Sequence, residues 1–155
     1  MDMTRPRAST LVMAAAFSGA LVLSGCQQVL PFVIQSPPKF DQKTIDALTT
    51  TQQDADALFT TLSATTGCAY SANSAQFDVV DADLAALVKE AGAMANNSFT
   101  LNGSTSLQQG FDKFRAAAAS TPAGCPPPGL AQDKKSSFDA AVASLAAYEN
   151  AKPKG

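Results

Sequence analysis

The feature that most constrains the fold of this chain is a spacing of apolar residues by three and four positions, which recurs in four separate segments. Residues spaced in this way lie on one face of an α-helix, whereas a half-buried β-strand needs strict alternation. The first segment runs from Gln42 to about Thr65, with Asp41 or Thr44 as its cap. Its seam consists of Ile45, Leu48, Gln52, Ala55, Phe59 and Leu62. The pattern predicts an amphipathic helix that Gly67 terminates.

The second predicted helix begins near Asn73 and ends at Asn96-Asn97. Asn73 and Gln76 have the spacing of a capping box, in which each side chain binds a free amide of the first turn. The apolar seam of this helix consists of Phe77, Val80, Leu84, Leu87, Ala91 and Met94. Its spacing matches that of the first helix, so the two helices have complementary apolar faces.

The third predicted helix begins at Thr105 and ends before Thr121. The preceding residues, Ser98 to Gly103, are expected to form an ordered connector, because they contain the turn dipeptide Asn-Gly. The fourth helix extends from about Leu130 to Asn150. The apolar positions are Leu107, Phe111, Phe114 and Ala118 in the third helix and Phe138, Val142, Leu145 and Tyr148 in the fourth.

Four amphipathic helices with short connections predict an all-α fold, a small up-down four-helix bundle. The absence of Trp and the many Ala, Ser and Thr residues favour helices packed closely through small side chains. We expect the bundle domain to occupy residues 41–151 and to be followed by a short tail, residues 152–155.

The residues before the first helix have the pattern of an exported protein. Arg5 and Arg7 supply positive charge, and an apolar region follows over residues 9–23. The segment closes on Leu23-Ser24-Gly25-Cys26. These four residues resemble the lipobox of bacterial lipoproteins, in which leucine stands three positions before an obligatory cysteine and small residues lie between them. The resemblance covers residues 1–26 and does not extend to the rest of the chain.

The resemblance implies that residues 1–25 are a signal peptide and that Cys26 carries the acyl chains, palmitate among them, that anchor the protein. More than one acyl chain makes such an anchor stable. Residues 26–40, which contain several prolines, would then be a lipid-anchored tether. Two alternatives are an ordinary signal peptide with an incidental cysteine and a transmembrane helix. The apolar run is shorter than the roughly 20 residues that a span needs.

The residue after the cysteine bears on the membrane in which the protein resides. In the sorting scheme that accompanies this family in bacteria with two membranes, aspartate at that position retains the protein in the inner membrane. Gln27 stands there in this chain. The resemblance therefore implies a lipid anchor in the outer membrane, facing the periplasm, if the host has two membranes.

Two cysteines remain once Cys26 is assigned to lipid, namely Cys68 and Cys125. An even remainder in an exported, oxidising context predicts one disulfide bond. An up-down bundle supports the pairing, because the loops that hold Cys68 and Cys125 lie at the same end. The alternative is two separate thiols.

The candidate chemistry of the chain is sparse. It contains no His, so the commonest general base and the commonest zinc ligand are missing. Asp78, Asp81 and Asp83 lack the central glycine and terminal glutamate of a calcium loop. The net charge of −2, with only Lys134-Lys135 as a basic pair, argues against nucleic acid. We expect a protein that is not an enzyme and uses no metal or cofactor.

These observations predict an envelope protein with a structural or protein-interaction role, and another envelope protein as its partner. Two alternatives are a pilot that chaperones an outer-membrane assembly and a carrier of a small apolar ligand or lipid. A carrier would need a cavity, and the candidates to line one are Phe59, Phe77, Phe111, Phe114 and Phe138. A filled seam between the helices would instead make these side chains ordinary core.

Overall fold

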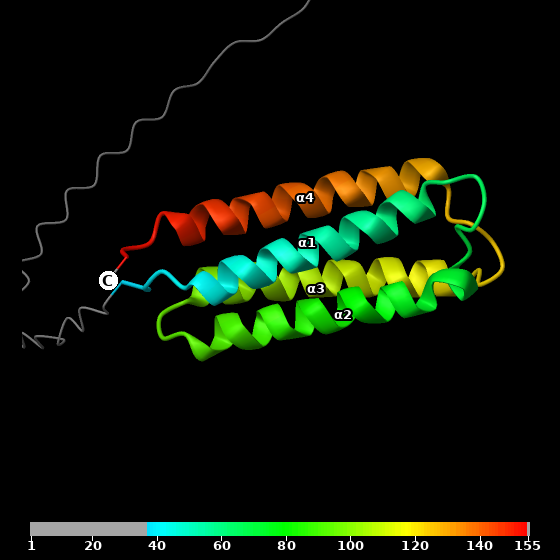
Figure 1. Cartoon of the computed structure of the whole chain (residues 1–155). Helices are drawn as coiled ribbons and strands as arrows, with labels where there is room; N and C mark the ends of the chain where they lie inside the picture. The colour runs from blue at the N-terminus through cyan, green and yellow to red at the C-terminus, as the bar shows by residue number, and fades with distance from the viewer. Residues whose placement is uncertain (1–36, 155) are drawn as a thin grey trace, which may run out of the picture. The chain divides into compact units, whose positions relative to one another are not determined.

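The computed structural model describes residues 37–154, which form four α-helices and contain no strand. The helices are α1 (Gln42–Leu62), α2 (Tyr70–Ala93), α3 (Ser98–Ala119) and α4 (Pro128–Asn150). Each helix runs antiparallel to the next, and each packs against two neighbours in the cyclic order α1, α2, α3, α4 (Figure 1). The predicted all-α up-down bundle is confirmed.

The bundle is a compact unit with its own core. Ile34–Gly155 form one unit of the chain, and the buried apolar residues of the core all lie between Leu48 and Leu145. A segment that covers its own core can fold by itself. The lipobox and Cys26 lie outside the described residues. Among the described helices, none is long and apolar enough to cross a membrane.

The start of α1 matches the prediction. The Asp41 carboxylate accepts hydrogen bonds from the amides of Lys43, at 3.3 Å, and Thr44, at 3.0 Å. Asp41 is thus the N-cap, and the free amides of the first turn are satisfied. The helix ends at Leu62, three residues earlier than expected, and Gly67 takes a φ of +73° in the loop that follows.

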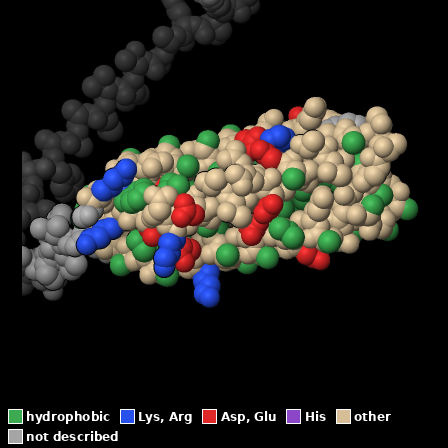
Figure 2. Space-filling model, viewed as in Figure 1, with side chains coloured by type: hydrophobic (Ala, Val, Ile, Leu, Met, Phe, Trp, Pro, Cys, Tyr) green, Lys and Arg blue, Asp and Glu red, His purple; other side chains and the backbone are tan. Residues whose placement is uncertain are grey.

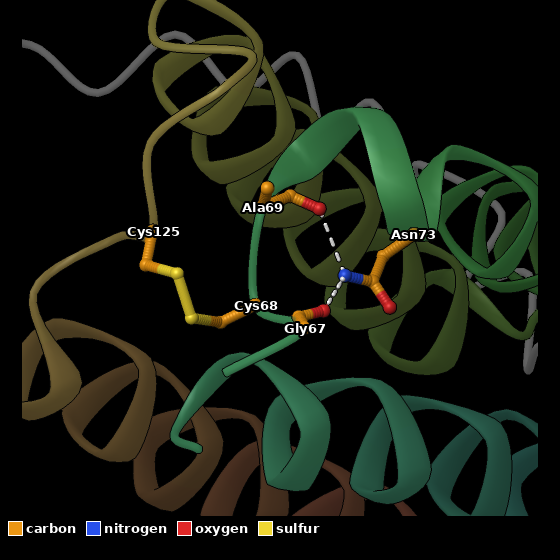
Figure 3. Close-up of a disulfide and its surroundings, with 5 residues drawn as sticks. All are labelled: Gly67, Cys68, Ala69, Asn73 and Cys125. Atoms are coloured by element: carbon orange, nitrogen blue, oxygen red, sulfur yellow. Dashed lines mark hydrogen bonds between the residues drawn. A yellow bond between two sulfur atoms is a disulfide. The ribbon is translucent and has the colours of Figure 1, made fainter. Parts of the chain in front are cut away.

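The second helix begins at Tyr70, so the predicted capping box at Asn73 is wrong. The Asn73 side chain is buried and turns back toward the preceding loop (Figure 3). Its amide nitrogen donates to the carbonyl oxygens of Gly67, at 2.7 Å, and Ala69, at 2.8 Å. Asn73 therefore ties the α1–α2 loop to α2 instead of capping the helix.

The third helix begins at Ser98, so the connector expected before Thr105 is also wrong. Thr100 and Ser104 are fully buried, one helical turn apart, and extend the inner face of α3 by two turns. Gly103 lies close to α4, since a Cβ there would lie 2.5 Å from Leu145 Cδ2 and the leucine side chain would have to shift. The Asn-Gly pair thus permits a close approach of α3 to α4, and the chain does not turn there.

The core differs between the two halves of the bundle. The half next to the α1–α2 and α3–α4 loops is filled by five phenylalanine rings, those of Phe59, Phe77, Phe111, Phe114 and Phe138. In the contacts that join Phe59, Phe111, Phe114 and Phe138, the ring centroids are 5.4–6.5 Å apart. We call it the aromatic half. The other half, where α1 begins and α4 ends, buries polar side chains and is called the polar half. The buried polar residues of this half are Thr44, Thr51, Asn97, Thr100, Ser104, Glu149 and Lys152.

A disulfide bond joins Cys68 and Cys125 at the end of the aromatic half, as predicted (Figure 3). The two Cα atoms are 4.9 Å apart, within the range that disulfides adopt. Cys68 is buried and Cys125 is exposed. The bond links the α1–α2 loop to the α3–α4 loop, so it closes the bundle at one end.

The opposite end is closed by residues that we expected to be a tail. Lys152 is buried, and the amide of Phe40 donates to the carbonyl of Pro153 at 3.2 Å. The Lys154 ammonium lies 4.9 Å from the centre of the Phe40 ring. The start and the end of the described chain therefore pack together, and residues 152–154 belong to the bundle.

Candidate functional site

The candidate site is a groove between α3 and α4 with a volume of about 360 Å³. These two helices pack less closely than the other neighbouring pairs. The groove is lined by Phe59 of α1, by Phe99, Gly103, Ser106, Leu107, Gly110, Phe111 and Phe114 of α3, and by Lys134, Ser137, Phe138, Ala141, Ser144 and Leu145 of α4. Its volume lies within the range of about 300–1,000 Å³ that ligand pockets occupy.

Small residues on both helices keep the groove open. Gly110 is exposed, and a Cβ added there would meet none of the described atoms within 4 Å, so the space beside this residue is open. Ala141 faces the same space from α4. At Gly103, by contrast, Leu145 fills the space beside the backbone. The two helices therefore touch at Gly103 and leave a gap at Gly110.

The floor of the groove is aromatic. Phe59, Phe111, Phe114 and Phe138 line it, and each is at most 6% exposed. The fifth phenylalanine, Phe77, packs behind them, with its ring centroid 5.8 Å from that of Phe111. Four of the five phenylalanines considered as cavity-lining residues thus line the groove, and they belong to the core as well.

The rim of the groove is polar and carries a single charged residue. Three serines, Ser106, Ser137 and Ser144, lie at its edge together with Lys134. The Lys134 side chain is exposed and has no acidic partner within the part of the chain that the structure describes. None of the described carboxylates lines the groove, so Lys134 supplies the charge of its lining.

The neighbouring Lys135 is held differently from Lys134. Its ammonium binds the carboxylates of Asp56 on α1 and Asp139 on α4, the latter at 2.9 Å. The hydrogen bonds that the Lys135 ammonium donates to Asp56 and then to Asp139 raise the pKa of Lys135. For Asp139, burial acts to raise the pKa, but the hydrogen bond and charge of Lys135 outweigh it and lower the pKa. Lys135 therefore joins α1 to α4, and the predicted basic pair divides into one structural and one free cation.

An exposed aromatic pair marks the end of the groove in the polar half. Phe99 is 50% exposed, and its ring centroid lies 4.2 Å from that of Tyr148. The Lys152 ammonium is 5.1 Å from the centre of the Tyr148 ring. Sequence reasoning missed Phe99 as a lining residue because residues 98–103 were assigned to a connector.

A buried ion pair lies below that aromatic pair. The Lys152 ammonium donates to Glu149 Oε1 and to Asn97 Oδ1, each at 2.5 Å. The Thr100 hydroxyl also donates to Glu149 Oε1, while Glu149 Oε2 has no hydrogen-bond partner. The charges are enclosed, with side-chain exposures of 0% for Glu149 and 3% for Lys152. This cluster joins α3 to the end of α4.

The aspartates considered as metal ligands or solvated charges make contacts between helices. Asp78 and Asp81 of α2 bind the guanidinium of Arg115 on α3. Asp83 of α2 lies close to Asp54 of α1, and burial followed by the Asp54 carboxyl raises the pKa of Asp83. Within residues 37–154, no three His, Cys, Asp or Glu side chains are grouped as a metal site would need.

The charges of the bundle are distributed unevenly along its length. On the face shown in Figure 2, Lys and Arg side chains gather toward the end where α1 begins and α4 ends, and the disulfide end shows none.

Comparison of the chain with protein-family models, with curated proteins and with solved structures finds no match. The function must therefore be argued from the groove and its charge.

Proposed function

We propose that the protein is a lipid-anchored envelope protein that binds a small apolar ligand in the groove between α3 and α4. The observation that carries the proposal is the open space above an aromatic floor, beside Gly110 and Ala141. Apolar surface that could be buried contributes about 25 cal/mol per Å². A bundle with a purely structural role gains stability by filling such a groove, and this one leaves it open.

The size and shape of the groove favour a small ligand over a helix of a partner protein. A bound helix with its side chains is about 10–12 Å wide. Here α3 and α4 remain in contact where Gly103 meets Leu145, so a helix has no room to enter between them. A slender molecule needs only the width of its own chain. Carriage of a ligand therefore fits better than a pilot or a structural role.

The lipobox supplies the location in this proposal. The acyl chains on Cys26 would hold the bundle at the periplasmic side of the outer membrane, where apolar molecules have to cross an aqueous compartment. The proposed role is one of binding and not of catalysis, because the carboxylates of Asp56, Asp139 and Glu149 are engaged in ion pairs with lysines.

The test is a variant that fills the groove without disturbing the helix. Gly110→Leu places a side chain where no atom lies within 4 Å. The matched control is Gly129→Leu, which makes the same change in equally open surroundings outside the groove. Binding of the neutral dye N-phenylnaphthylamine to residues 34–155 is measured by fluorescence titration.

We expect the dye to bind saturably to the unaltered protein and to Gly129→Leu. Gly110→Leu should bind it about tenfold more weakly, or less well still, a loss of at least about 1.4 kcal/mol. Equal binding to all three proteins would place the dye elsewhere and contradict the proposal. A complementary test is extraction of the intact lipidated protein from membranes, followed by native mass spectrometry of any ligand that accompanies it.

A further inference from the structure

The charge at the rim of the groove defines the ligand more closely than the apolar floor does. Among residues 37–154, Lys134 is the only charged one that lines the groove. Elsewhere on the bundle, Lys135, Arg115 and Lys152 are each bound to at least one carboxylate. A cation without a partner at the mouth of an apolar site is available to pair with an anionic group of the ligand.

The surroundings of Lys134 do not neutralise it. Asp56 and Asp139 are both bound to Lys135, and the exposed Asp133, which precedes Lys134 in the sequence, does not line the groove. None of the described aspartates and glutamates lines the groove. Lys134 is thus the cation that a ligand meets at the rim of the groove. Its charge is screened by the solvent around the exposed side chain.

The residues that line the groove extend along much of α4. Lys134 and Leu145, both lining residues, are 11 positions apart on one helix, which corresponds to about 16 Å at 1.5 Å per residue. Leu145 touches α3 at Gly103, so the groove narrows there. A volume of about 360 Å³ spread over this length suits a single extended chain better than a broad ring system.

We propose that the ligand is a single-chain anionic amphiphile of the fatty-acid class. Its carboxylate would pair with Lys134, and its chain would lie over Phe138, Phe114 and Phe111 toward Leu145. Serine hydroxyls at the rim, such as that of Ser137, can donate to the same carboxylate. This inference rests on the proposed function, since it specifies the ligand of the same groove.

The experiment compares an acid with its neutral counterpart. Laurate and dodecanol have the same chain and differ in the charge of the head group, and each is used to displace N-phenylnaphthylamine from residues 34–155 below its aggregation concentration. The variants are Lys134→Gln and Lys134→Glu. The matched control is Lys113→Gln, because Lys113 is also an exposed lysine without an acidic partner but does not line the groove.

We expect laurate to bind more tightly than dodecanol to the unaltered protein and to Lys113→Gln. Lys134→Gln should weaken laurate about two- to fivefold and leave dodecanol unchanged, as the loss of one exposed ion pair allows. Lys134→Glu should reverse the preference. Raising the salt concentration should shrink the preference in the unaltered protein. Among octanoate, decanoate and laurate, each added methylene should tighten binding by up to about fourfold.

Two results would overturn the inference. If laurate and dodecanol bind equally and neither responds to Lys134→Gln or Lys134→Glu, the ligand is not selected for its charge, although the groove still binds apolar molecules. If neither compound displaces the dye, and the affinity of the dye is unchanged in Gly110→Leu, the proposed function fails as well. Circular dichroism of each variant confirms that the helices are retained.

Discussion

The aromatic half and the polar half of this bundle are held together by different means. The aromatic half packs phenylalanine rings and is closed by the Cys68–Cys125 bond, whereas the polar half buries the Glu149–Lys152 ion pair. Phenylalanine rings in tilted and edge contacts leave room at their margin, and the groove opens over them. The ion pair instead closes the polar half around its hydrogen bonds.

The contrast between the two halves shows how a small bundle can retain a groove. A core with an unfilled groove has lost part of its packing energy. A covalent bond at the same end offsets that loss, because it constrains the unfolded chain and is indifferent to how the core is packed. The bundle thus places its cross-link where the packing is least complete.

The largest expected effect concerns the polar half. Lys152→Met leaves the Glu149 carboxylate buried with only the Thr100 hydroxyl to bind it. Removing one partner of a buried ion pair typically costs about 3–5 kcal/mol of stability. Urea unfolding of residues 34–155 followed by circular dichroism measures the change.

The double variant Glu149→Gln, Lys152→Met serves as the control for that experiment. Because it removes the unpaired charge, it should recover a good part of the lost stability, and the two changes should be non-additive. Additive effects would show that the ion pair is not what closes the polar half, and the comparison of the two halves would fail.

The second effect concerns the disulfide bond. Replacing Cys68 and Cys125 by serine opens a link across 57 positions, for which the chain-entropy model gives about 4 kcal/mol as an upper figure. Hydrogen exchange should accelerate first in the aromatic half, at the ends of α1 and α3. Faster exchange confined to the polar half would contradict the idea that the disulfide bond stabilises the aromatic half.

A third effect is smaller and has a built-in control. Thr51 is fully buried and its hydroxyl has no hydrogen-bond partner, whereas the equally buried Thr44 hydroxyl donates to Asp41 at 2.8 Å. Thr51→Val should therefore stabilise the protein by about 1 kcal/mol, because an unsatisfied polar group is removed. Thr44→Val should destabilise it by about the same amount. Thermal unfolding of both variants would show opposite shifts, and shifts of the same sign would be inconsistent with this account.

The general fold was predictable from the sequence because the apolar seams repeat at helical spacing. Leu84, Leu87, Phe111 and Phe114 of the predicted seams are buried as expected, whereas Met94 is only partly buried and lies just beyond the end of α2. The first two turns of α3 were missed because their inner face is polar: Thr100 and Ser104 have no apolar signal. The spacing of apolar residues identifies the apolar face of a helix, but it does not identify a face that buries hydroxyl groups.

The candidate site was only partly predictable. The phenylalanines were recognised as possible lining residues, but spacing along a helix does not tell whether a neighbouring helix covers them. The gap depends on Gly110 and Ala141, two small residues on different helices whose shared location is a property of the fold. The free charge of Lys134 was equally hidden, since Asp56 and Asp139 could have bound either lysine of the pair.

The smallest expected effect is a pH dependence that arises near the middle of the bundle. Burial, and then the Asp54 carboxyl across the α1–α2 interface, raise the pKa of Asp83 above its ordinary value of 3.8. A raised pKa means that the folded protein binds this proton more tightly than the unfolded chain does. The contribution of Asp83 to stability is therefore complete below about pH 4 and is lost as the pH rises through the folded-state value.

Asp83→Asn should for this reason be more stable than the unaltered protein at pH 7, with a difference that shrinks toward zero near pH 4. Asp139→Asn provides the contrast, because the pKa of Asp139 is lowered by Lys135 and its contribution is present above the ordinary value and lost below it. That variant should be less stable at pH 7. Urea midpoints of the three proteins across this range measure both signs. If Asp83→Asn were destabilising at pH 7, the two carboxylates would have to be bound to each other in a way that outweighs their repulsion. The α1–α2 interface would then be held at mid-length by a polar contact, outside the polar half.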